Sequence, residues 1–566
     1  MRVVLVVPPQ LVEEEDERVE YLGLGYVAAM ARRHGYSVDI IDCRYPPLDY
    51  EDAVQKIDAL SPHVVGVTAP FALDLTSTVK LSQMLRNAKY EGLIVVGGHP
   101  ATFTYHTLLS QFPTIDVVVR GEGEVTFLEL LQRPNKGHNW RQVPGIAYRE
   151  DGQVVATEPR PLIGDLDSLP FPARDNLTTA GAPASVAWFR SQGVVPGTMI
   201  ASSRGCPFRC TFCSVQAFYR SSPGPRWRAR SAMNVIDEMT DLVEKWGVRM
   251  FRFSDDNFLG SCQKGKMRAR ELATLLIERD LGVKFIIECR VTDVEYPLFS
   301  LLKRAGLTRV HLGIESGIPR MLENFSKHAT PEQNKEAISM LKELGIEYHP
   351  NFILVDPETT LEELRQNLVF FRDTRMYQAP NAFHILYSNR LGLFAGTPLL
   401  ERYQAAHRAK PWRFQRLTEE EDTITATIGA IMDYEMKDPQ VMQFLKLHLR
   451  VISELTRRDK SLVRLQRQLH IDLAETSLPH SMPERQQGNG PGLFPRIERW
   501  RANAGTLALR LFEQTLTRAE RGAIKDETVE RHFQEFLSEI DRYDILHFEK
   551  TVDKLVQTAN TVPAAC

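Results

Sequence analysis

Short runs of β-branched and other apolar residues alternate with amphipathic stretches over the first 131 residues of the chain. Strands that alternate with helices of about ten residues predict βαβ units and a parallel, doubly wound sheet. The predicted strands are Val3–Val7, Ser37–Asp42, Val64–Thr68, Leu93–Val96 and Asp116–Val119, and the predicted helices are Leu24–Arg33, Asp52–Leu60, Thr76–Asn87, Tyr105–Phe112 and Glu124–Leu131.

The loops that follow these strands are rich in small and turn-forming residues. They include Pro8-Pro9, Ala69-Pro70, Gly97-Gly98-His99-Pro100 and Gly121-Glu122-Gly123-Glu124. Parallel sheets bind ligands at the carboxyl ends of their strands. These loops are therefore the predicted ligand-binding edge of the first domain.

The pattern changes twice further along the chain. Residues 134–190 have a hairpin signal at Asp151-Gly152 and a Pro-rich stretch typical of an extended connector. Strand–helix alternation returns from Gly197 to about Thr397, and beyond residue 400 the strand signal nearly vanishes. We predict an α/β protein with a Rossmann-like doubly wound sheet at 1–133, a connector at 134–190, a partial (β/α) barrel at 191–400 and a mostly helical domain at 401–566.

In the second region the predicted strands and helices again alternate. The strands are Thr198–Ser202, Met250–Ser254, Lys284–Cys289, Arg309–Ile314 and Tyr348–Val355, and the main helices are Ala232–Trp246, Met267–Arg279, Tyr296–Ala305 and Pro331–Leu344. The helical stretches expected near the end of the chain are Tyr434–Arg457, Arg496–Ala519 and Glu527–Thr558.

Composition narrows the class of protein. The 566 residues are 43% hydrophobic and 25% charged, with a net charge of −3, so no overall basic field indicates nucleic acid as a partner. No run reaches about 18 apolar residues, the length that a membrane span requires. Three of the seven cysteines cluster and the rest are scattered, which favours one metal site in a reducing cytoplasm over a disulfide framework.

The clustered cysteines are Cys206, Cys210 and Cys213, spaced C-x3-C-x2-C directly after a predicted strand. Three thiolates on one loop can wrap an iron–sulfur cluster and leave one of its irons open to another molecule. A structural zinc site is the alternative. It needs a fourth Cys or His nearby, and the next candidates, Cys262 and His311, are distant in sequence.

The segment Cys206-Pro-Phe-Arg-Cys-Thr-Phe-Cys213 resembles the radical S-adenosylmethionine (SAM) superfamily. The resemblance implies that the open iron of a [4Fe–4S] cluster binds SAM, and that reduction of the cluster yields a 5′-deoxyadenosyl radical. It implies that the three cysteines ligate the cluster and that further residues contact SAM. The alternative for each of these further residues is that it lies at the end of a barrel strand and only caps the next helix. The implied contacts are Phe212 along the adenine, Ser254, Asp255 and Asp256 at the methionine amino group, Glu288 and Arg290 at the ribose and carboxylate, and Glu315 and Ser316 in a G-I-E-S strand below the cofactor. Val355-Asp-Pro-Glu-Thr359 departs from the G-x-P-G-E-T turn found in many relatives.

The Gly97-Gly-His-Pro100 and Asp116–Glu124 segments resemble the cobalamin-binding domain that precedes many radical SAM enzymes. Two local motifs carry less weight: Gly23-Leu-Gly lies well past the first strand, and Ser61-Pro-His63 lacks the Asp of the usual D-x-H-x-x-G signature, so we expect no histidine below cobalt. A vestigial domain that only supports the barrel is the alternative. The residues implied at cobalamin are Pro8, Thr68, Phe71, Gly97, Gly98, His99, Gly121 and Glu122.

The two resemblances together imply a cobalamin-dependent radical SAM enzyme. The expected reaction is methylation, via methylcobalamin, of an unactivated carbon in a small-molecule or peptide-derived intermediate, with a flavodoxin- or ferredoxin-type electron donor. Segments such as Cys289-Arg-Val-Thr-Asp293 also resemble the anaerobic magnesium-protoporphyrin monomethyl ester cyclase, so a radical cyclisation or rearrangement stays open. A sensor needs no open iron, and a methylthiotransferase needs more N-terminal cysteines than Cys43, so both are disfavoured.

Overall fold

The computed structural model describes residues 1–11, 20–44, 47–133, 138–175, 197–379, 390–413, 417–475 and 493–541. The chain forms two compact units. The first comprises Met1–Gly313, Leu322–Tyr348 and Gly392–Glu435, and the second comprises Ile314–Met321, His349–Leu391 and Met436–Cys566.

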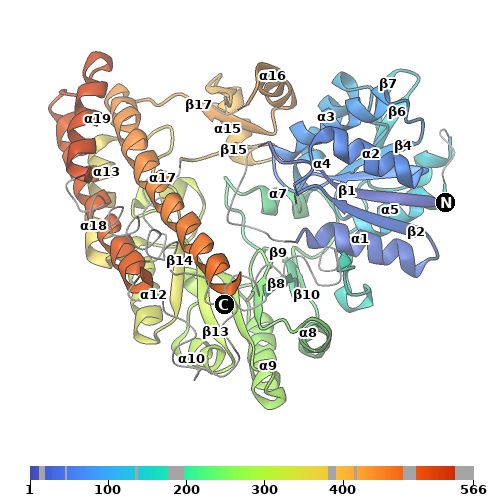
Figure 1. Cartoon of the computed structure of the whole chain (residues 1–566), viewed down its shortest axis with the longest axis horizontal. Helices are drawn as coiled ribbons and strands as arrows, with labels where there is room; N and C mark the ends of the chain where they lie inside the picture. The colour runs from blue at the N-terminus through green and yellow to red at the C-terminus, as the bar shows by residue number, and fades with distance from the viewer. Residues whose placement is uncertain are drawn as a thin grey trace, which may run out of the picture. The chain divides into compact units, whose positions relative to one another are not determined.

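A seven-stranded sheet in the order β2-β1-β3-β4-β5-β6-β7 begins the first unit. Its first five strands are parallel, which confirms the predicted doubly wound sheet. Helices α1 (Leu22–Arg33) and α5 (Gly123–Gln132) cover one face, and α2 (Tyr50–Leu60), α3 (Asp74–Asn87) and α4 (His99–Gln111) cover the other (Figure 1). The strands are β1 (Arg2–Val7), β2 (Ser37–Asp42), β3 (Val64–Thr68), β4 (Leu93–Gly97), β5 (Val117–Val119), β6 (Ile146–Glu150) and β7 (Gln153–Ala156).

The hairpin β6–β7 extends this sheet beyond residue 133, where the sequence pattern predicts the first domain to end. Strand β6 pairs antiparallel with β5, and β7 pairs antiparallel with β6. Asp151 and Gly152 both have positive φ, 51° and 78°, which is the left-handed geometry that a tight hairpin turn requires. The connector therefore contributes two strands to the first domain.

A second, five-stranded sheet has the order β14-β13-β12-β11-β8, and its strands coincide with the five predicted for the partial barrel. A two-stranded ribbon, β9 (Ser203–Gly205) and β10 (Trp227–Ala229), lies between β8 and β11 in sequence and flanks the cysteine loop and α7 (Ser214–Arg220). The strands are β8 (Gly197–Ile200), β11 (Met250–Phe253), β12 (Lys284–Arg290), β13 (Leu307–Glu315) and β14 (Glu347–Phe352), and the helices are α8 (Ala232–Trp246), α9 (Gln263–Arg279), α10 (Tyr296–Arg304), α11 (Pro319–Asn324), α12 (Pro331–Glu343) and α13 (Leu361–Thr374).

The segment Gly392–Glu435 belongs to the first unit and contains short strands that the sequence pattern does not predict. Helix α16 packs on α3: the Thr76 and Thr425 hydroxyls are 2.8 Å apart, and Lys80 pairs with Glu421 at 2.6 Å. Strands of two to four residues are too short to show alternation. The elements are β15 (Leu393–Phe394), α15 (Pro398–Ala405), β16 (Ala409–Pro411), α16 (Glu419–Ile428) and β17 (Ile431–Tyr434).

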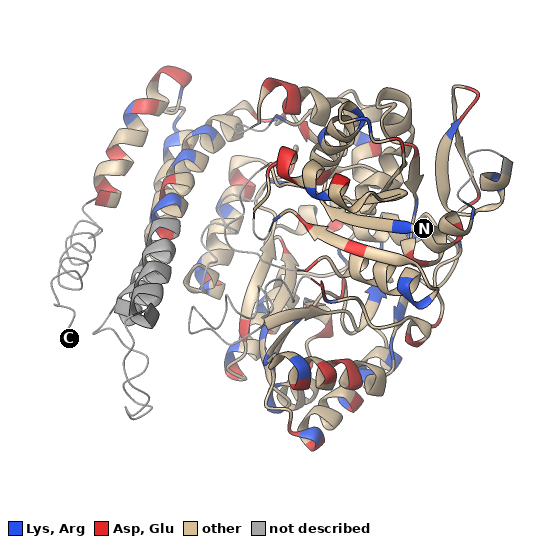
Figure 2. Ribbon diagram, turned by 45° about the vertical axis from the view of Figure 1, so that its right-hand side comes forward, with Lys and Arg blue, Asp and Glu red and all other residues tan. Residues whose placement is uncertain are grey.

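The second unit contains the helical region predicted near the end of the chain. Helices α17 (Pro439–Glu475), α18 (Leu493–Glu520) and α19 (Asp526–Ile540) pack against one another, and α18 packs on α13. Lys and Arg are interspersed with Asp and Glu along the helices of the chain (Figure 2). Within the described ranges, no helix combines the length and the apolar character that crossing a membrane requires.

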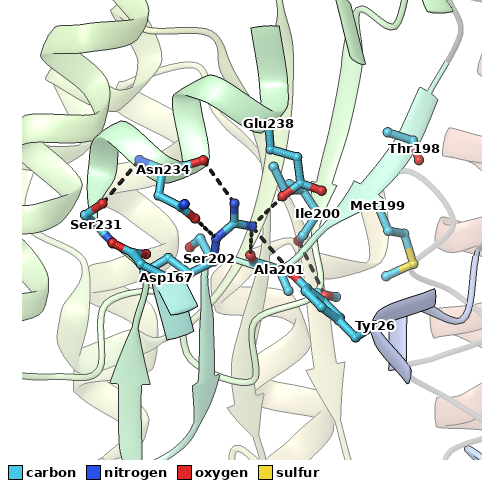
Figure 3. A network of polar contacts seen from close by, with 12 residues as sticks. Tyr26, Asp167, Thr198, Met199, Ile200, Ala201, Ser202, Ser231, Asn234 and Glu238 are labelled. Atoms are coloured by element: carbon cyan, nitrogen blue, oxygen red, sulfur yellow. Dashed lines mark hydrogen bonds and ion pairs between the residues drawn. The ribbon is translucent and has the colours of Figure 1, made fainter. Parts of the chain in front are cut away.

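Buried polar contacts join α1, which covers the first sheet, to α8 and to the end of β8 in the second (Figure 3). The Arg230 guanidinium contacts the Glu238 carboxylate and the Ala201 carbonyl, and lies 3.5 Å from the Tyr26 hydroxyl on α1. Arg174 of the connector also pairs with Glu238, at 2.8 Å. Because breaking a buried charge pair leaves an uncompensated charge, these contacts hold α1, the connector and α8 together.

Alanine substitutions at two glycines with positive φ distinguish the cost of backbone strain from the cost of atomic overlap. Gly98 has φ 128°, and a Cβ there would lie 2.1 Å from the Ala69 carbonyl oxygen, whereas Gly35 has φ 84° and open space around the Cβ position. We expect Gly35→Ala to cost about 1–2 kcal/mol and Gly98→Ala to cost more than about 3 kcal/mol, because the second change adds overlap to strain. Thermal denaturation of both variants measures the difference, and equal destabilisation would contradict this interpretation of Gly98.

Candidate cofactor and active site

A cavity of about 340 Å³ lies at the carboxyl ends of the parallel strands of the first sheet. One wall comes from the glycine-rich loops after these strands. Another comes from the ends of β8 and β11 of the second sheet, through Ala201, Ser254 and Asp256, and from the ribbon strand β9, through Ser203 and Arg204. The structure brings together six of the residues predicted at cobalamin. These are Thr68, Gly97, Gly98, His99, Gly121 and Glu122.

Pro8 and Phe71 are the two predicted cobalamin contacts that the structure does not place among the residues lining the cavity. Pro8 is buried at the end of β1. Phe71 is 63% exposed, and its ring meets the Tyr21 ring edge-on at 6.1 Å. The Phe71 backbone N–H donates to the Asp74 carboxylate at 2.9 Å, which fixes this loop at the start of α3.

Missing side chains create the space in the cavity. A Cβ built on Gly97 would meet only Val119, at 3.7 Å, and one built on Gly23 would meet nothing within 4 Å. A side chain at either position would project into the cavity, so glycine keeps the floor flat. Gly23 lies in the first turn of α1, which confirms that its motif is not the turn after the first strand, although the residue does line the cavity.

Aromatic rings form one side of the cavity. The His99 imidazole stacks on Phe218 of α7 with centroids 3.8 Å apart and planes at 16°, and Tyr219 meets it edge-on at 6.2 Å. Burial lowers the pKa of His99 to about 4, so the ring is neutral at physiological pH and presents a polar edge without a charge. Phe218 and Tyr219 are not among the predicted site residues, because nothing in their spacing relates them to a histidine more than a hundred residues earlier.

A buried carboxylate links the cavity to the cysteine loop. Glu122 accepts hydrogen bonds from Arg204 at 3.0 Å and Arg228 at 2.9 Å, and Arg204 also binds Glu124 at 2.6 Å. Burial alone raises the pKa of Glu122, but the two arginines outweigh it and lower the pKa overall. Arg204 is two residues before Cys206, so this network holds the start of the cysteine loop against the Gly121–Glu124 turn. Arg204, Arg228 and Glu124 were not among the predicted site residues.

The three cysteines of the loop are close enough to influence one another electrostatically, and all are free thiols. Burial raises the pKa of Cys206, and it raises the pKa of Cys213 to about 12. Thiolates in such a place need a compensating cation, which the irons of a cluster supply. Within the described residues no three Cys, His, Asp or Glu side chains form a group that could hold one metal ion. A cubane differs in that each thiolate binds a separate iron.

The predicted SAM contacts at the end of β11 have different environments. Asp255 is fully buried and accepts hydrogen bonds from the Ser202 amide at 2.7 Å and from the Ser202 and Ser203 hydroxyls at 2.6 Å. Its carboxylate is therefore engaged in holding the start of β9. Asp256 and Ser254 line the cavity, and burial raises the pKa of Asp256 to about 6, with the charge of Asp255 adding to the rise.

The other predicted SAM contacts lie on several elements. Phe212 meets Phe325 edge-on at 5.0 Å, and Glu288 lies 3.7 Å from Arg252. Arg290 is buried beside Cys210, and its N–H donates to the Cys210 sulfur at 3.5 Å.

In the second unit, Glu315 and Ser316 are both buried. Glu315 has φ 62°, a left-handed conformation that costs energy in a residue other than glycine and is common at functional sites. The Ser316 hydroxyl accepts the Ile318 N–H at 3.2 Å, so it shapes the turn after β13.

The near-match to a cobalamin histidine motif lies away from the cavity. His63 is exposed before β3, and its Nδ1 accepts the Arg2 amide at 3.1 Å. The amino end of a parallel strand is opposite the ligand-binding edge, so His63 is remote from the cavity. The flat floor and aromatic wall fit a large planar ligand, and the three free thiols of one loop fit a cluster.

The lowered pKa of His99 predicts how acid affects stability. The folded state binds the imidazole proton only below about pH 4, whereas the unfolded chain binds it below about pH 6.5. Stability from this group is therefore complete above pH 6.5 and is lost as the pH falls towards 4, by at most about 3 kcal/mol. His99→Phe keeps the stacking on Phe218. We expect this variant to lose less stability than the wild type between pH 7 and 4 in denaturant titrations of the apoprotein. Parallel pH profiles would contradict the assignment.

The Glu122 network predicts that breaking a buried ion pair costs much more stability than breaking an exposed one. We expect Glu122→Gln to cost about 3–5 kcal/mol, because it leaves Arg204 and Arg228 buried without their shared partner. Glu347→Gln breaks the exposed Arg309–Glu347 pair, 2.7 Å apart, and serves as the control with an expected cost below about 1 kcal/mol. Chemical denaturation measures both changes, and a Glu122→Gln cost as small as that of the control would contradict the structural role.

Two family models match parts of the chain. Residues 13–131 match the family model described as the B12 binding domain, and residues 200–371 match the Radical SAM superfamily. These two stretches carry the cavity loops and the cysteine loop.

Two relatives match more than half of the chain. An uncharacterized methyltransferase of Pyrococcus horikoshii is 33% identical over 375 residues, which cover 65% of this chain and 77% of that protein. The anaerobic magnesium-protoporphyrin IX monomethyl ester cyclase of Rubrivivax gelatinosus is 32% identical over 369 residues, covering 62% of this chain and 61% of the cyclase.

A solved structure shares the fold along nearly the whole chain. The cobalamin-dependent SAM radical enzyme OxsB, with aqua-cobalamin and SAM bound, matches with a TM-score of 0.65 and 17% identity, covering 96% of this chain and 84% of that chain. The implied domain order, partial barrel and helical C-terminal region are thereby confirmed. The chain belongs to the family of cobalamin-dependent radical SAM enzymes, whose cofactors are a [4Fe–4S] cluster, SAM and cobalamin.

Proposed function

We propose that the protein methylates an unactivated carbon of a small-molecule or peptide-derived intermediate. The observation that carries this proposal is the composition of the cavity wall. Arg204 comes from β9, directly before the cysteine loop, and Ser254 and Asp256 follow β11 of the second sheet; all three line the same cavity as Gly97 and His99 of the first sheet. One cavity that serves both halves suits a reaction in which both cofactors act on one substrate.

The chain's own residues position these groups. The cluster would be held by Cys206, Cys210 and Cys213. The planar cofactor would lie on a flat surface formed by Thr68, Gly97, Gly98 and Gly121. When bound, the cofactors supply a methyl group and a hydrogen-abstracting radical, so that a C–H bond of the substrate is replaced by a C–CH₃ bond. The described side chains supply placement and exclude water.

The immediate surroundings of the cavity suit this task. The neutral imidazole of His99 adds no charge to the cavity near neutral pH. The buried charges of Glu122 and Arg204 neutralise one another. Apolar residues such as Leu5, Val67 and Phe127 complete the lining.

A radical cyclisation or rearrangement is the second candidate, because the Rubrivivax cyclase is 32% identical. In either case an acidic one-electron carrier of the flavodoxin or ferredoxin type supplies electrons. A reducing cytoplasm is the compartment that we propose, since all six cysteines in the described part of the chain are free.

Analysis of the products of SAM separates the two reactions. We expect protein reconstituted anaerobically with iron, sulfide and hydroxocobalamin to hold about four irons and one cobalt. With SAM and a low-potential reductant, a methyltransferase forms both S-adenosylhomocysteine and 5′-deoxyadenosine, whereas a cyclase forms 5′-deoxyadenosine alone. Chromatography with mass detection quantifies both.

The triple variant Cys206→Ser, Cys210→Ser and Cys213→Ser is the control. We expect it to lose the iron and the 5′-deoxyadenosine but to keep the cobalt, because the cavity is built from other residues. Wild-type protein that binds iron without cobalt would contradict the proposal. Cobalt binding without S-adenosylhomocysteine would favour the cyclase reaction.

A further inference from the structure

Two buried N–H donors reach the sulfur atoms of the cysteine loop. The Arg290 Nη1 lies 3.5 Å from the Cys210 sulfur, and the Asn257 side-chain amide nitrogen lies 3.9 Å from the Cys206 sulfur. Asn257 is 1% exposed and Arg290 is 5% exposed. Both donors therefore act on the thiols from inside the protein, with little water to screen them.

The Arg290 guanidinium is fixed on more than one side. Its Nη2 donates to the Lys327 carbonyl, and the group lies 3.6 Å from the centre of the Phe208 ring. Phe208 is itself part of the cysteine loop. Both terminal nitrogens are thus committed to the surroundings of the cluster, in contrast to the SAM contact that the sequence resemblance implies for this residue.

Asn257 is held in the same way. Its side-chain oxygen accepts the Gly260 N–H at 3.0 Å, and its amide nitrogen also lies 3.1 Å from the Ser261 hydroxyl. That hydroxyl donates to the Asp293 carboxylate at 2.6 Å. Asp293 is three residues after Arg290 and is influenced by its charge.

These residues form a partial polar ring: hydrogen bonds run from Cys206 through Asn257 and Ser261 to Asp293, the charge of Arg290 influences Asp293, and Arg290 donates to Cys210. We propose that Arg290 and Asn257 set the reduction potential of the cluster by donating hydrogen bonds to its thiolates, and that Arg290 is a positioning and tuning residue rather than a ligand of SAM. The inference rests on the proposed binding of the cluster by Cys206, Cys210 and Cys213.

The physical basis is the charge that reduction adds. A one-electron reduction makes the cluster and its thiolates more negative, so donors and a nearby cation stabilise the reduced form more than the oxidised form. In a buried site this difference is larger than in water. Arg290 and Asn257 should therefore raise the potential and make the cluster easier to reduce by a carrier protein.

Potentiometric titration of the reconstituted protein, followed by electron paramagnetic resonance, tests the proposal. We expect Arg290→Met to lower the potential, and Arg290→Lys to fall between it and the wild type, because lysine keeps the charge but loses the planar fork. Asn257→Asp keeps the acceptor for Gly260 and removes the donor to Cys206, so it should also lower the potential.

Arg209→Met is the matched control. Arg209 lies in the same loop between Cys206 and Cys210 but is exposed, so the loss of its charge is screened by water and should shift the potential much less. Iron, sulfide and SAM affinity are measured for every variant.

The outcomes are distinct. Wild-type protein without iron means that the proposed cluster site has failed, whatever the ring does. If the wild type is fully loaded with iron and both Arg290→Met and Asn257→Asp have the same reduction potential as the wild type, the inference is overturned while the proposed cluster site stands. Weaker SAM binding at an unchanged potential would make Arg290 a SAM contact and also overturn it. If both variants lose the cluster, the ring is structural and the proposal fails. If only one variant loses the cluster, the reduction potential of the other variant decides the outcome.

Discussion

The arrangement of the cofactor sites depends on one buried carboxylate, that of Glu122. It lies between Arg204 and Arg228, which belong to the two strands that flank the cysteine loop. Burying charges is costly, and the cost is offset only while all partners stay together. The loop after β5 and the start of the cysteine loop are therefore fixed against each other, beside the cavity that Glu122 and Arg204 both line.

Much of this architecture could be predicted from the sequence, because its parts are local. The five parallel strands and the Asp151–Gly152 turn follow from apolar runs and turn chemistry, and the cysteine loop follows from spacing. Arg204, Phe218 and Tyr219 could not be predicted, since their roles arise from contacts with Glu122 and His99, far away in sequence. A pattern within one segment contains no information about such a partner.

Other residues of the predicted site are engaged locally. Asp255 accepts hydrogen bonds from the Ser202 and Ser203 hydroxyls, and the Ser316 hydroxyl caps a turn. The Phe71 backbone N–H donates to the carboxylate of Asp74. Short polar side chains readily bond to nearby backbone. The same letters in a motif can therefore support the backbone around a site or contact the ligand in it, and only the hydrogen-bond partners distinguish the two.

The return of Gly392–Glu435 to the helices of the first sheet has a consequence for biosynthesis. Ile424 and Ile428 of α16 belong to the same buried cluster as Leu75 and Val79 of α3. Until the ribosome has released this segment, those apolar side chains of α3 lack part of their cover, although their own sheet was translated hundreds of residues earlier. The nascent chain therefore carries an incompletely covered N-terminal domain until this segment emerges, and apolar surface exposed in that interval favours aggregation during translation.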